Sequence, residues 1–492
     1  MSDIPRLTAF VLQFYMNNIK ILLTFFVIFS SFFIFGCSQK VTKLKTVDIA
    51  DIQKDMQTQL SVTSKQKKKL NPFWWREFHD KQLSSIISKA LKTAPSLKSI
   101  EQRYIKANMR VKKANSTKLP TLGLSGGAYE VKFNKSVVPE PLAGETQSFF
   151  TAGVATRYKF DFWDERKSRI LATKNRAYAQ KIYIDEQKLA LSTAIARFYI
   201  SWSFEEQQID LLQEVLSNYK EQKNIETQKF VTGLSDSIAL NHQNENISNT
   251  EYKILQLRES IEGQKEAICI LAGLYPSAAK SFTKPTIHTS LYPQIDKGVY
   301  LNSLSNRPDI EMQKFIIKSN SYYIAHAQSR FYPNINLSGV LNLFSLDLSG
   351  MKDSDSFGAI AGISLDLPIF DWGRREANLE EKLANYNSSI YEYNHLVTQA
   401  ANETVGTLMK IRYVQKQVKA YEHLQDQRVK NSNIIHTRYT IGVINKLPYL
   451  QSELGVLQSR FVLLGLSQNS NHLYIELIKA LGGGFIADDK HS

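Results

Sequence analysis

The residue best placed to carry covalent chemistry in this chain is Cys37. It follows a run of apolar residues, Ile21–Phe35, that comes directly after the positive charge of Lys20. A short apolar run after a positive charge, closed by a small residue, is typical of a secretory signal peptide. We therefore expect residues 1–36 to be removed on export, with Met16 as an alternative start. The competing interpretation is a buried Cys at the end of a core helix.

The Gly36-Cys37 junction resembles the lipobox of bacterial lipoproteins. That resemblance implies a diacylglycerol on the Cys37 thiol and a further acyl chain on the new amino terminus. Because Ser38 and not Asp comes next, it also implies transfer to the outer membrane. Two or more lipid chains hold a protein stably to a bilayer. Apart from this covalent lipid, no cofactor is expected.

Other reactive side chains give no sign of catalysis. Cys269 lies in the apolar run Ile268–Ala272 and has no partner once Cys37 is acylated, so we expect it to be a buried apolar residue. The chain has no HExxH, P-loop or GxSxG motif, and its histidines are scattered, among them His79, His242, His326 and His436. We expect neither an enzyme nor a metal site.

The formal net charge of +15 does not indicate a nucleic-acid partner. A short lysine run, Lys65 and Lys67 to Lys69, is typical of a solvated linker. An exported protein meets no genome, so no nucleic acid is expected to bind.

The elements that position these residues occur twice. Pro120 aligns with Pro333 at an offset of 213 residues, and Gly233 aligns with Gly442 at an offset of 209. A period of this length indicates duplication of one large unit rather than a solenoid.

Within each unit the hydrophobic period changes from helix to strand. Residues 97–118 and 310–331 lack Gly and Pro and predict helices that end before the two prolines. Apolar residues then alternate with polar or small ones, which predicts strand pairs within 121–162 and 334–370.

Very long helical hairpins are predicted after each strand pair, at 164–275 and 372–481. Apolar residues there follow a 4-3 spacing, as in Leu191, Ile195, Phe198 and Trp202. That spacing is typical of helices packed along their length.

Four predicted strands are too few to close a barrel, for which about eight are needed. Unpaired backbone groups at open strand edges cannot face lipid, since each costs several kcal/mol. If the strands lie in a membrane, several copies must close one barrel together. A soluble sheet with one wet face would show the same alternation, so the strand pattern leaves both interpretations open.

Five motifs occur along the chain, and their order and spacing are informative. They are Trp74-Trp75-x-x-Phe78-x-Asp80-x-Gln82-Leu83, Arg307-Pro308-Asp309-Ile310, Leu367-Pro368-Ile369-Phe370-Asp371-Trp372-Gly373-Arg374-Arg375, Arg438-Tyr439-x-x-Gly442 and Ala480-Leu481-Gly482-Gly483-Gly484-Phe485. Together they resemble the TolC family of outer membrane efflux proteins, in the acylated branch that serves pumps of the resistance-nodulation-division type. The resemblance covers essentially the whole mature chain.

The resemblance implies an α+β membrane protein that is internally duplicated. It would be a homotrimer in which four strands per protomer close a twelve-stranded outer-membrane β-barrel, continuous with a long periplasmic α-helical barrel. The expected segments are a signal peptide (1–36), an acylated linker (37–72), a first repeat (73–283), an equatorial connector (284–305), a second repeat (306–485) and a tail (486–492).

The resemblance also implies partners and functional positions. A periplasmic adaptor protein and an inner-membrane efflux transporter would bind, with outer membrane lipid around the barrel. The turns Thr232-Gly233-Leu234 and Ile441-Gly442-Val443 would form tips that dock the adaptor. Leu447 matches a leucine that narrows the closed tube, and Gln451 stands where relatives often place an aspartate. Pro448 would loosen the helix after the tip unless it falls within the first turn.

The implied function is a passive exit duct for drugs or other small toxic solutes, in the outer membrane of a Gram-negative bacterium. One alternative is a type I protein-secretion duct of the same fold, which usually lacks the lipid. A second is an anchored periplasmic coiled-coil scaffold that transports nothing. The sequence does not identify the solute, because a tunnel need not bind its cargo tightly.

Replacing Cys37 with Ser is predicted to abolish incorporation of radiolabelled palmitate, because the substitution removes the thiol that accepts the diacylglycerol. Cys269→Ser is the matched control and should keep the label. Persistent labelling of the Cys37→Ser protein would rule out this attachment site.

Overall fold

The computed structural model describes residues 44, 46–60, 71–136, 139–141, 143–287, 304 and 306–485. The predicted signal peptide, Cys37 and the tail 486–492 lie outside the described residues. The chain divides into two units, Met1–Lys45 and Thr46–Ser492, and the elements named here all belong to the second.

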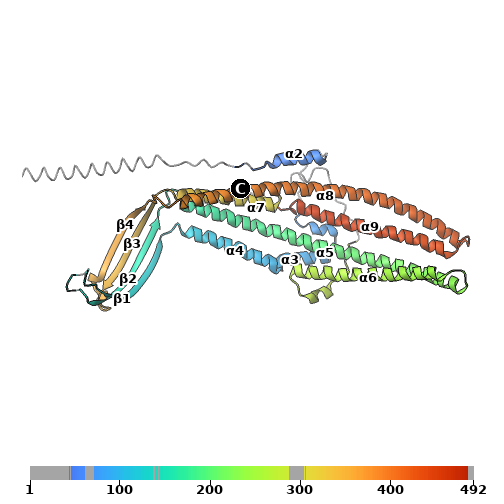
Figure 1. Cartoon of the computed structure of the whole chain (residues 1–492), viewed down its shortest axis with the longest axis horizontal. Coiled ribbons are helices and arrows are strands. Elements are labelled where there is room, and N and C mark those ends of the chain that lie inside the picture. Colours follow the sequence, from blue (N-terminus) through green and yellow to red (C-terminus); the bar gives the residue numbers. More distant parts are fainter. Residues whose placement is uncertain are drawn as a thin grey trace, which may run out of the picture. The chain divides into compact units, whose positions relative to one another are not determined.

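Each repeat holds a helix, a strand pair and a pair of long helices (Figure 1). In the first repeat these are α4 (Pro95–Ser116), β1 (Thr121–Lys132), β2 (Thr146–Lys159), α5 (Glu165–Val231) and α6 (Ser237–Ala272). In the second they are α7 (Pro308–Ser329), β3 (Asn334–Ser345), β4 (Phe357–Asp366), α8 (Arg374–Thr440) and α9 (Lys446–Ala480). Shorter helices are α2 (Ile49–Leu60), η1 (Trp74–Phe78), α3 (Lys81–Thr93), η2 (Pro276–Ser281), η4 (Gly350–Lys352) and η5 (Ser354–Ser356).

Prolines set the ends of the shorter repeat helices. α4 begins at Pro95 and α7 at Pro308, where the missing N–H costs no intrahelical bond. Both helices end a few residues before the next proline, Pro120 or Pro333. The long helices α5 and α8 are 67 residues each, or about 100 Å. No helix in the described part of the chain is both long enough and apolar enough to cross a membrane.

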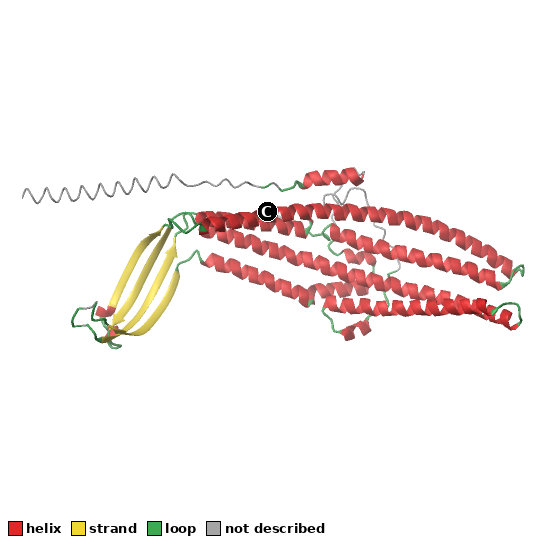
Figure 2. Ribbon diagram, viewed as in Figure 1, coloured by secondary structure: helices red, strands yellow, loops and turns green. Residues whose placement is uncertain are grey.

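The two strand pairs form one antiparallel sheet in the order β1-β2-β3-β4 (Figure 2). Pairing of β2 with β3 joins the repeats, with Val154 opposite Leu341. β1 and β4 are the edges, so each has one row of backbone groups unpaired in the protomer.

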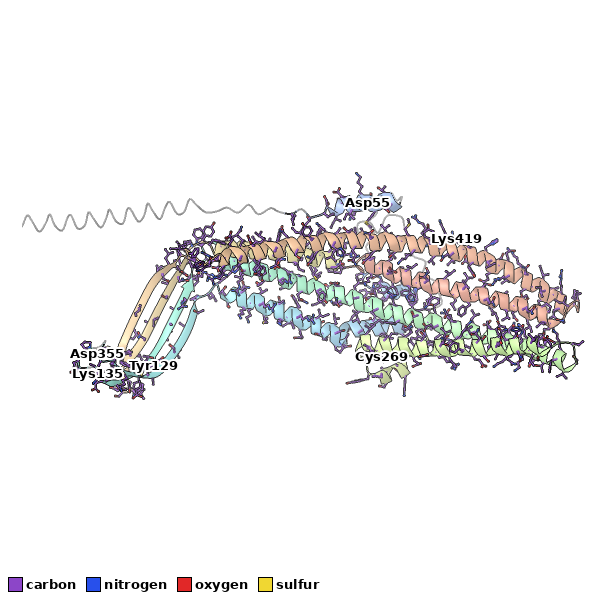
Figure 3. All side chains as sticks on the ribbon, viewed as in Figure 1. Asp55, Tyr129, Lys135, Cys269, Asp355 and Lys419 are labelled. Atoms are coloured by element: carbon purple, nitrogen blue, oxygen red, sulfur yellow. The ribbon has the colours of Figure 1, made fainter. Side chains whose placement is uncertain are left out.

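The edge strands expose large apolar side chains. Leu122 and Leu124 on β1 are 77% and 83% exposed, and Ile360 and Ile363 on β4 are 72% and 73% exposed. Figure 3 places Tyr129, Lys135 and Asp355 at the end of the sheet that lies away from the long helices.

α5 is the central helix of the bundle. It packs against α4, α6, α7 and α9, whereas α8 packs against α7, α9 and α2. The largest core cluster joins η1, α3 and α5 and includes Trp74, Tyr199 and Trp202. Asp80 ties this cluster together, because its carboxylate accepts the Leu83 N–H at 2.8 Å and the Tyr199 hydroxyl at 2.9 Å. The predicted α+β fold with internal duplication is confirmed.

One detail of the predicted helix packing is wrong. Ile195 and Trp202 are buried, but Phe198 is 37% exposed and Tyr199 takes the buried place. A straight α-helix has 3.6 residues per turn, so a 3.5-residue pattern drifts around its surface. Cys269, in contrast, is a free and buried cysteine as predicted.

A buried arginine joins the start of the second repeat to its end. Arg307 is 9% exposed and donates to Asp309 at 2.7 Å, to Glu403 of α8 at 2.9 Å and to the Ala480 carbonyl at 3.1 Å. Burial by itself would lower the pKa of Arg307, but the hydrogen bonds and charges of Asp309 and Glu403 together outweigh burial and raise it. The Arg-Pro-Asp motif therefore fastens the start of α7 to the middle of α8 and to the end of α9.

Gly482→Ala is predicted to lower the thermal midpoint of unfolding more than Gly442→Ala. Both glycines have positive φ angles, 83° and 78°, which cost an alanine about 1 kcal/mol. Only at Gly482 would the new Cβ also meet backbone, the Asn306 carbonyl oxygen at 2.7 Å, while Gly442 has nothing within 4 Å. Equal midpoints for the two variants, measured by circular dichroism, would contradict this account.

Candidate functional site

The first hairpin turn joins α5 to α6. Thr232 is the C-cap of α5, and Gly233 follows with a φ of 73°, a left-handed conformation that glycine adopts without strain. The Leu234 N–H donates to the Lys229 carbonyl at 2.7 Å, which closes the helix end. Asp236 then caps α6, and the side chain of Leu234 is left 80% exposed.

The second hairpin turn repeats this geometry 209 residues later (442 − 233). Ile441 is the C-cap of α8, Gly442 has a φ of 78°, and the Val443 N–H donates to the Arg438 carbonyl at 2.9 Å. Asn445 caps α9. Figure 1 shows both turns at the end of the long helices that lies away from the sheet.

Polar side chains join the two hairpins close to these tips. Asn218 of α5 is 5% exposed, and its Nδ2 donates to the Leu450 carbonyl of α9 at 3.1 Å and to Glu453 Oε2 at 3.0 Å. Gln222 Nε2 donates to Asn218 Oδ1 at 2.7 Å. Lys446 at the start of α9 pairs with Glu221 of α5, and this hydrogen bond raises the pKa of Lys446.

The predicted constriction residues lie in the first two turns of α9. Leu447 is half-buried, and its N–H donates to Asn445 Oδ1 at 3.1 Å. Gln451, one turn further on, is exposed. Pro448 is the third residue of α9, so its missing N–H removes no intrahelical bond and the first turn is not loosened.

The strand-to-helix junctions expose aromatic side chains at the opposite end of the long helices. Phe162, Phe370 and Trp372 are 64%, 71% and 90% exposed. Arg375 lies beside them but pairs with Asp371 at 2.8 Å. Each junction therefore carries an apolar surface with its charges already paired or directed to solvent.

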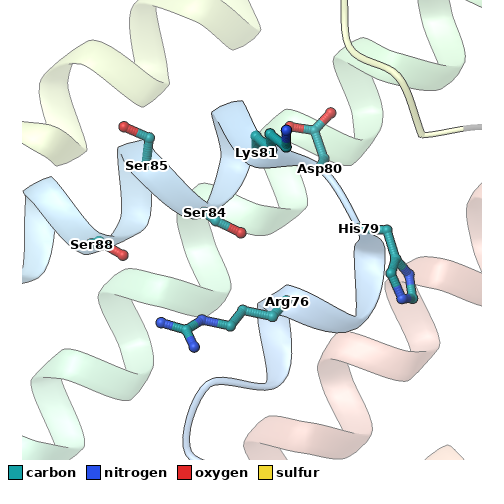
Figure 4. A pocket seen from close by; sticks show the side chains of 7 residues that line it. All are labelled: Arg76, His79, Asp80, Lys81, Ser84, Ser85 and Ser88. Atoms are coloured by element: carbon teal, nitrogen blue, oxygen red, sulfur yellow. The ribbon is translucent and has the colours of Figure 1, made fainter.

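A polar pocket lies beside the start of α3 (Figure 4). Its lining residues are Arg76, His79, Asp80, Lys81, Ser84, Ser85 and Ser88. Asp80 is already occupied, since its carboxylate also accepts the Thr286 N–H at 3.1 Å. Among the described residues, no three His, Cys, Asp or Glu side chains gather in a group that could hold a metal.

A four-stranded sheet with exposed apolar edges is thus joined to two helical hairpins, each of which contains one helix of 67 residues. The sequence profile of the outer membrane efflux protein family matches residues 86–274 and 299–483. The chain belongs to this family, which is a family of channels and not of enzymes.

Two relatives illustrate the family. The multidrug resistance outer membrane protein MdtQ of Escherichia coli O157:H7 is 26% identical over 428 residues, which cover 84% of this chain and 88% of MdtQ. The probable outer membrane lipoprotein SilC of Salmonella typhimurium is 23% identical over 416 residues, with coverage of 84% and 88%. The chain is an outer membrane efflux protein, and that prediction from its motifs is confirmed.

Solved structures share the fold. The outer membrane protein VceC of Vibrio cholerae superposes with a TM-score of 0.77 at 25% identity, covering 85% of this chain and 100% of VceC. The CmeC outer membrane channel of Campylobacter jejuni superposes with a TM-score of 0.78 at 20% identity, covering 88% of this chain and 93% of CmeC.

The polar contacts near the tips were not predicted from the sequence. A signal for them exists, because Asn218, Gln222 and Glu226 recur every four residues where the preceding apolar spacing of α5 continues. All three are buried. A helix seam that changes from apolar to polar indicates contacts that hold two helices by hydrogen bonds.

Asn218→Ala is predicted to loosen the start of α9, because it removes both donors to Leu450 and Glu453. Loss of these two hydrogen bonds should cost about 1–3 kcal/mol locally. Hydrogen exchange of residues 446–453 should accelerate, while Gln451→Ala, at an exposed position on the same turns, should leave exchange unchanged. Equal protection in both variants would show that Asn218 does not hold the tip.

Proposed function

We propose that this chain is the exit duct of a tripartite efflux pump. Three copies, with four strands each, close one twelve-stranded barrel in the outer membrane, and their helices form a tube in the periplasm. An inner-membrane transporter supplies the energy and a periplasmic adaptor links it to the duct. The name of MdtQ supports drugs or other small toxic solutes as cargo. Such a duct needs no catalytic group.

The observation that carries this proposal is the pair of open sheet edges. β1 and β4 each have one row of unpaired backbone groups and expose large apolar side chains. Unpaired backbone groups cannot face lipid, so pairing β1 of one copy with β4 of the next is the arrangement that satisfies both. The same reasoning favours a closed ring over a chain that ends in free edges.

A lipid on Cys37 would add a second attachment to the membrane. The linker is fixed to the bundle shortly after this cysteine, because the Val47 N–H donates to Asn394 Oδ1 of α8 at 2.8 Å. α2 then packs on α8, with Met56 1% exposed in the cluster that contains Val397. In this proposal the linker 37–72 starts at the lipid and precedes the first repeat, 73–283, while its helix α2 packs on α8 of the second repeat.

The hairpin tips are proposed as the adaptor's docking surface. The first tip, Thr232-Gly233-Leu234, and the second, Ile441-Gly442-Val443, are small turns with exposed apolar side chains, suited to packing against other helices. Leu447 would then form an apolar ring of three copies just inside the tube. Such a ring can close a pore by excluding water. Gln451 would add three amides, which attract cations less than carboxylates do.

Leu447→Ala is predicted to raise single-channel conductance in planar bilayers, because it widens the proposed apolar ring. Ile238→Ala is the matched control, since Ile238 is the position 209 residues earlier (447 − 238) and also follows a helix cap. Native mass measurements in mild detergent should give a trimer for both variants.

Three results would contradict the proposal. An assembled wild-type protein without conductance would favour a scaffold. A monomeric mass would remove the shared barrel. Conductance that rises equally in Ile238→Ala and Leu447→Ala would place the constriction elsewhere.

A further inference from the structure

The two hairpins share one offset along the chain but differ at a polar pair, Glu205 and Gln264, in the first hairpin. α5 and α8 begin 209 residues apart (374 − 165), and so do α6 and α9 (446 − 237). At the same offset, Glu205 corresponds to Val414 and Gln264 to Leu473. Val414 and Leu473 are buried apolar residues. The first hairpin therefore holds a carboxyl group and an amide where the second holds two apolar side chains.

The carboxyl group of Glu205 lies between α5 and α6. Glu205 is 9% exposed, and its Oε1 accepts the Ser260 hydroxyl at 3.0 Å and Gln264 Nε2 at 3.3 Å. Its other oxygen, Oε2, is buried without a hydrogen-bond partner, and so is Oε1 of Gln264. The contact thus contains two buried acceptors that lack a donor.

A single proton would supply that donor. When the carboxyl group is ionised, neither Glu205 Oε2 nor Gln264 Oε1 carries a hydrogen, and each unsatisfied atom costs free energy. A carboxylic acid and a primary amide, in contrast, can pair through two parallel hydrogen bonds, one in each direction. The N–H bond from Gln264 to Glu205 is already in place.

We propose that Glu205 binds a proton at neutral pH and forms a paired acid–amide contact with Gln264, which holds α6 on α5 and is released as the pH rises. This goes beyond export, because it assigns a proton-binding site to the first hairpin. The second hairpin, with Val414 and Leu473 at these positions, lacks that site.

Burial is the cause that raises the pKa of Glu205, while the hydrogen bonds from Ser260 and Gln264 oppose it. Ionisable groups on the elements packed around it are Glu206 and Asp210 on α5, Glu262 and Lys265 on α6, Asp80, Lys81 and Lys89 at α3, Lys284 after η2, and Arg460, His472 and Glu476 on α9. None of them contributes to this shift. Several are paired elsewhere: Lys265 with Glu262, and Lys284 with Asp210.

The direction of the pH dependence follows from the raised pKa. The stabilising contribution is fully present below the ordinary carboxyl pKa of about 4.3 and is lost as the pH rises toward the folded-state pKa. In that interval, the population in which α6 opens locally should rise about tenfold per pH unit, since opening releases one proton. Above the folded-state pKa it should level off.

Hydrogen exchange of the full-length protein in lipid nanodiscs tests this directly. Wild type is compared with Glu205→Gln, which keeps the shape without the titration, from pH 5 to 9 and after correction for intrinsic exchange. A Glu205→Val/Gln264→Leu variant, which copies the second hairpin, covers the case in which the amide disturbs folding. Opening of residues 258–268 should rise with pH in wild type alone. Residues 467–477 of α9 should behave alike in all three proteins.

Infrared spectroscopy at pH 7 gives an independent readout. The carbonyl band of a protonated carboxyl group should be present in wild type and absent in both variants. The proposal is overturned if this band does not differ, or if the opening of residues 258–268 depends on pH equally in wild type and Glu205→Gln. Neither measurement depends on transport, so the result is separate from the outcome for the proposed duct.

Discussion

The whole structure depends on where the backbone hydrogen bonds of the four strands are satisfied. Pairing of β2 with β3 removes two edges by joining the repeats, and β1 and β4 keep theirs. The helices follow the same lateral order. α4, α5, α7 and α8 contact one another in sequence, just as β1 to β4 do; α4 and α7 lead into β1 and β3, and β2 and β4 lead into α5 and α8. Consequently α4 and α8 continue the two open sides that β1 and β4 begin.

Nearer the tips the order becomes α6, α5, α9 and α8, so the open sides persist along the full length of the long helices. α5 and α8 run through both halves unbroken, while α4 and α7 give way to α6 and α9. A movement of the sheet relative to the hairpin tips would have to bend both α5 and α8. The buried Arg307 contacts lie where α7 ends its packing and α9 replaces it beside α5 and α8. They stabilise the bundle at the level where the helices beside α5 and α8 change.

Much of the fold could be predicted because its boundaries are encoded by residues with few backbone choices. Pro120 and Pro333 mark where helices must stop, and Gly233 and Gly442 supply the left-handed conformation of the tips. The contacts near the hairpin tips were harder to predict from the sequence. Hydrogen bonds such as that from Asn218 to Leu450 join residues 232 positions apart, and no local pattern specifies their partner. The constriction proposed at Leu447 would depend on other copies of the chain, and the 3.5-residue pattern misplaced Phe198 because a straight helix does not keep that period.

The two repeats share the same backbone path, but many of their side chains differ. The caps are equivalent, with Asp236 and Asn445 each bonding the next N–H groups. The aromatic residues at the two strand-to-helix junctions are not: Trp163 donates to the Pro333 carbonyl at 2.9 Å and stacks on Tyr332, whereas Trp372 is 90% exposed. Residues that set the path of the backbone must be equivalent in the two repeats, because both repeats contribute helices to one continuous bundle. Interior contacts within a single hairpin carry no such requirement, so the two hairpins of one chain can differ in how firmly they are held and in what weakens them.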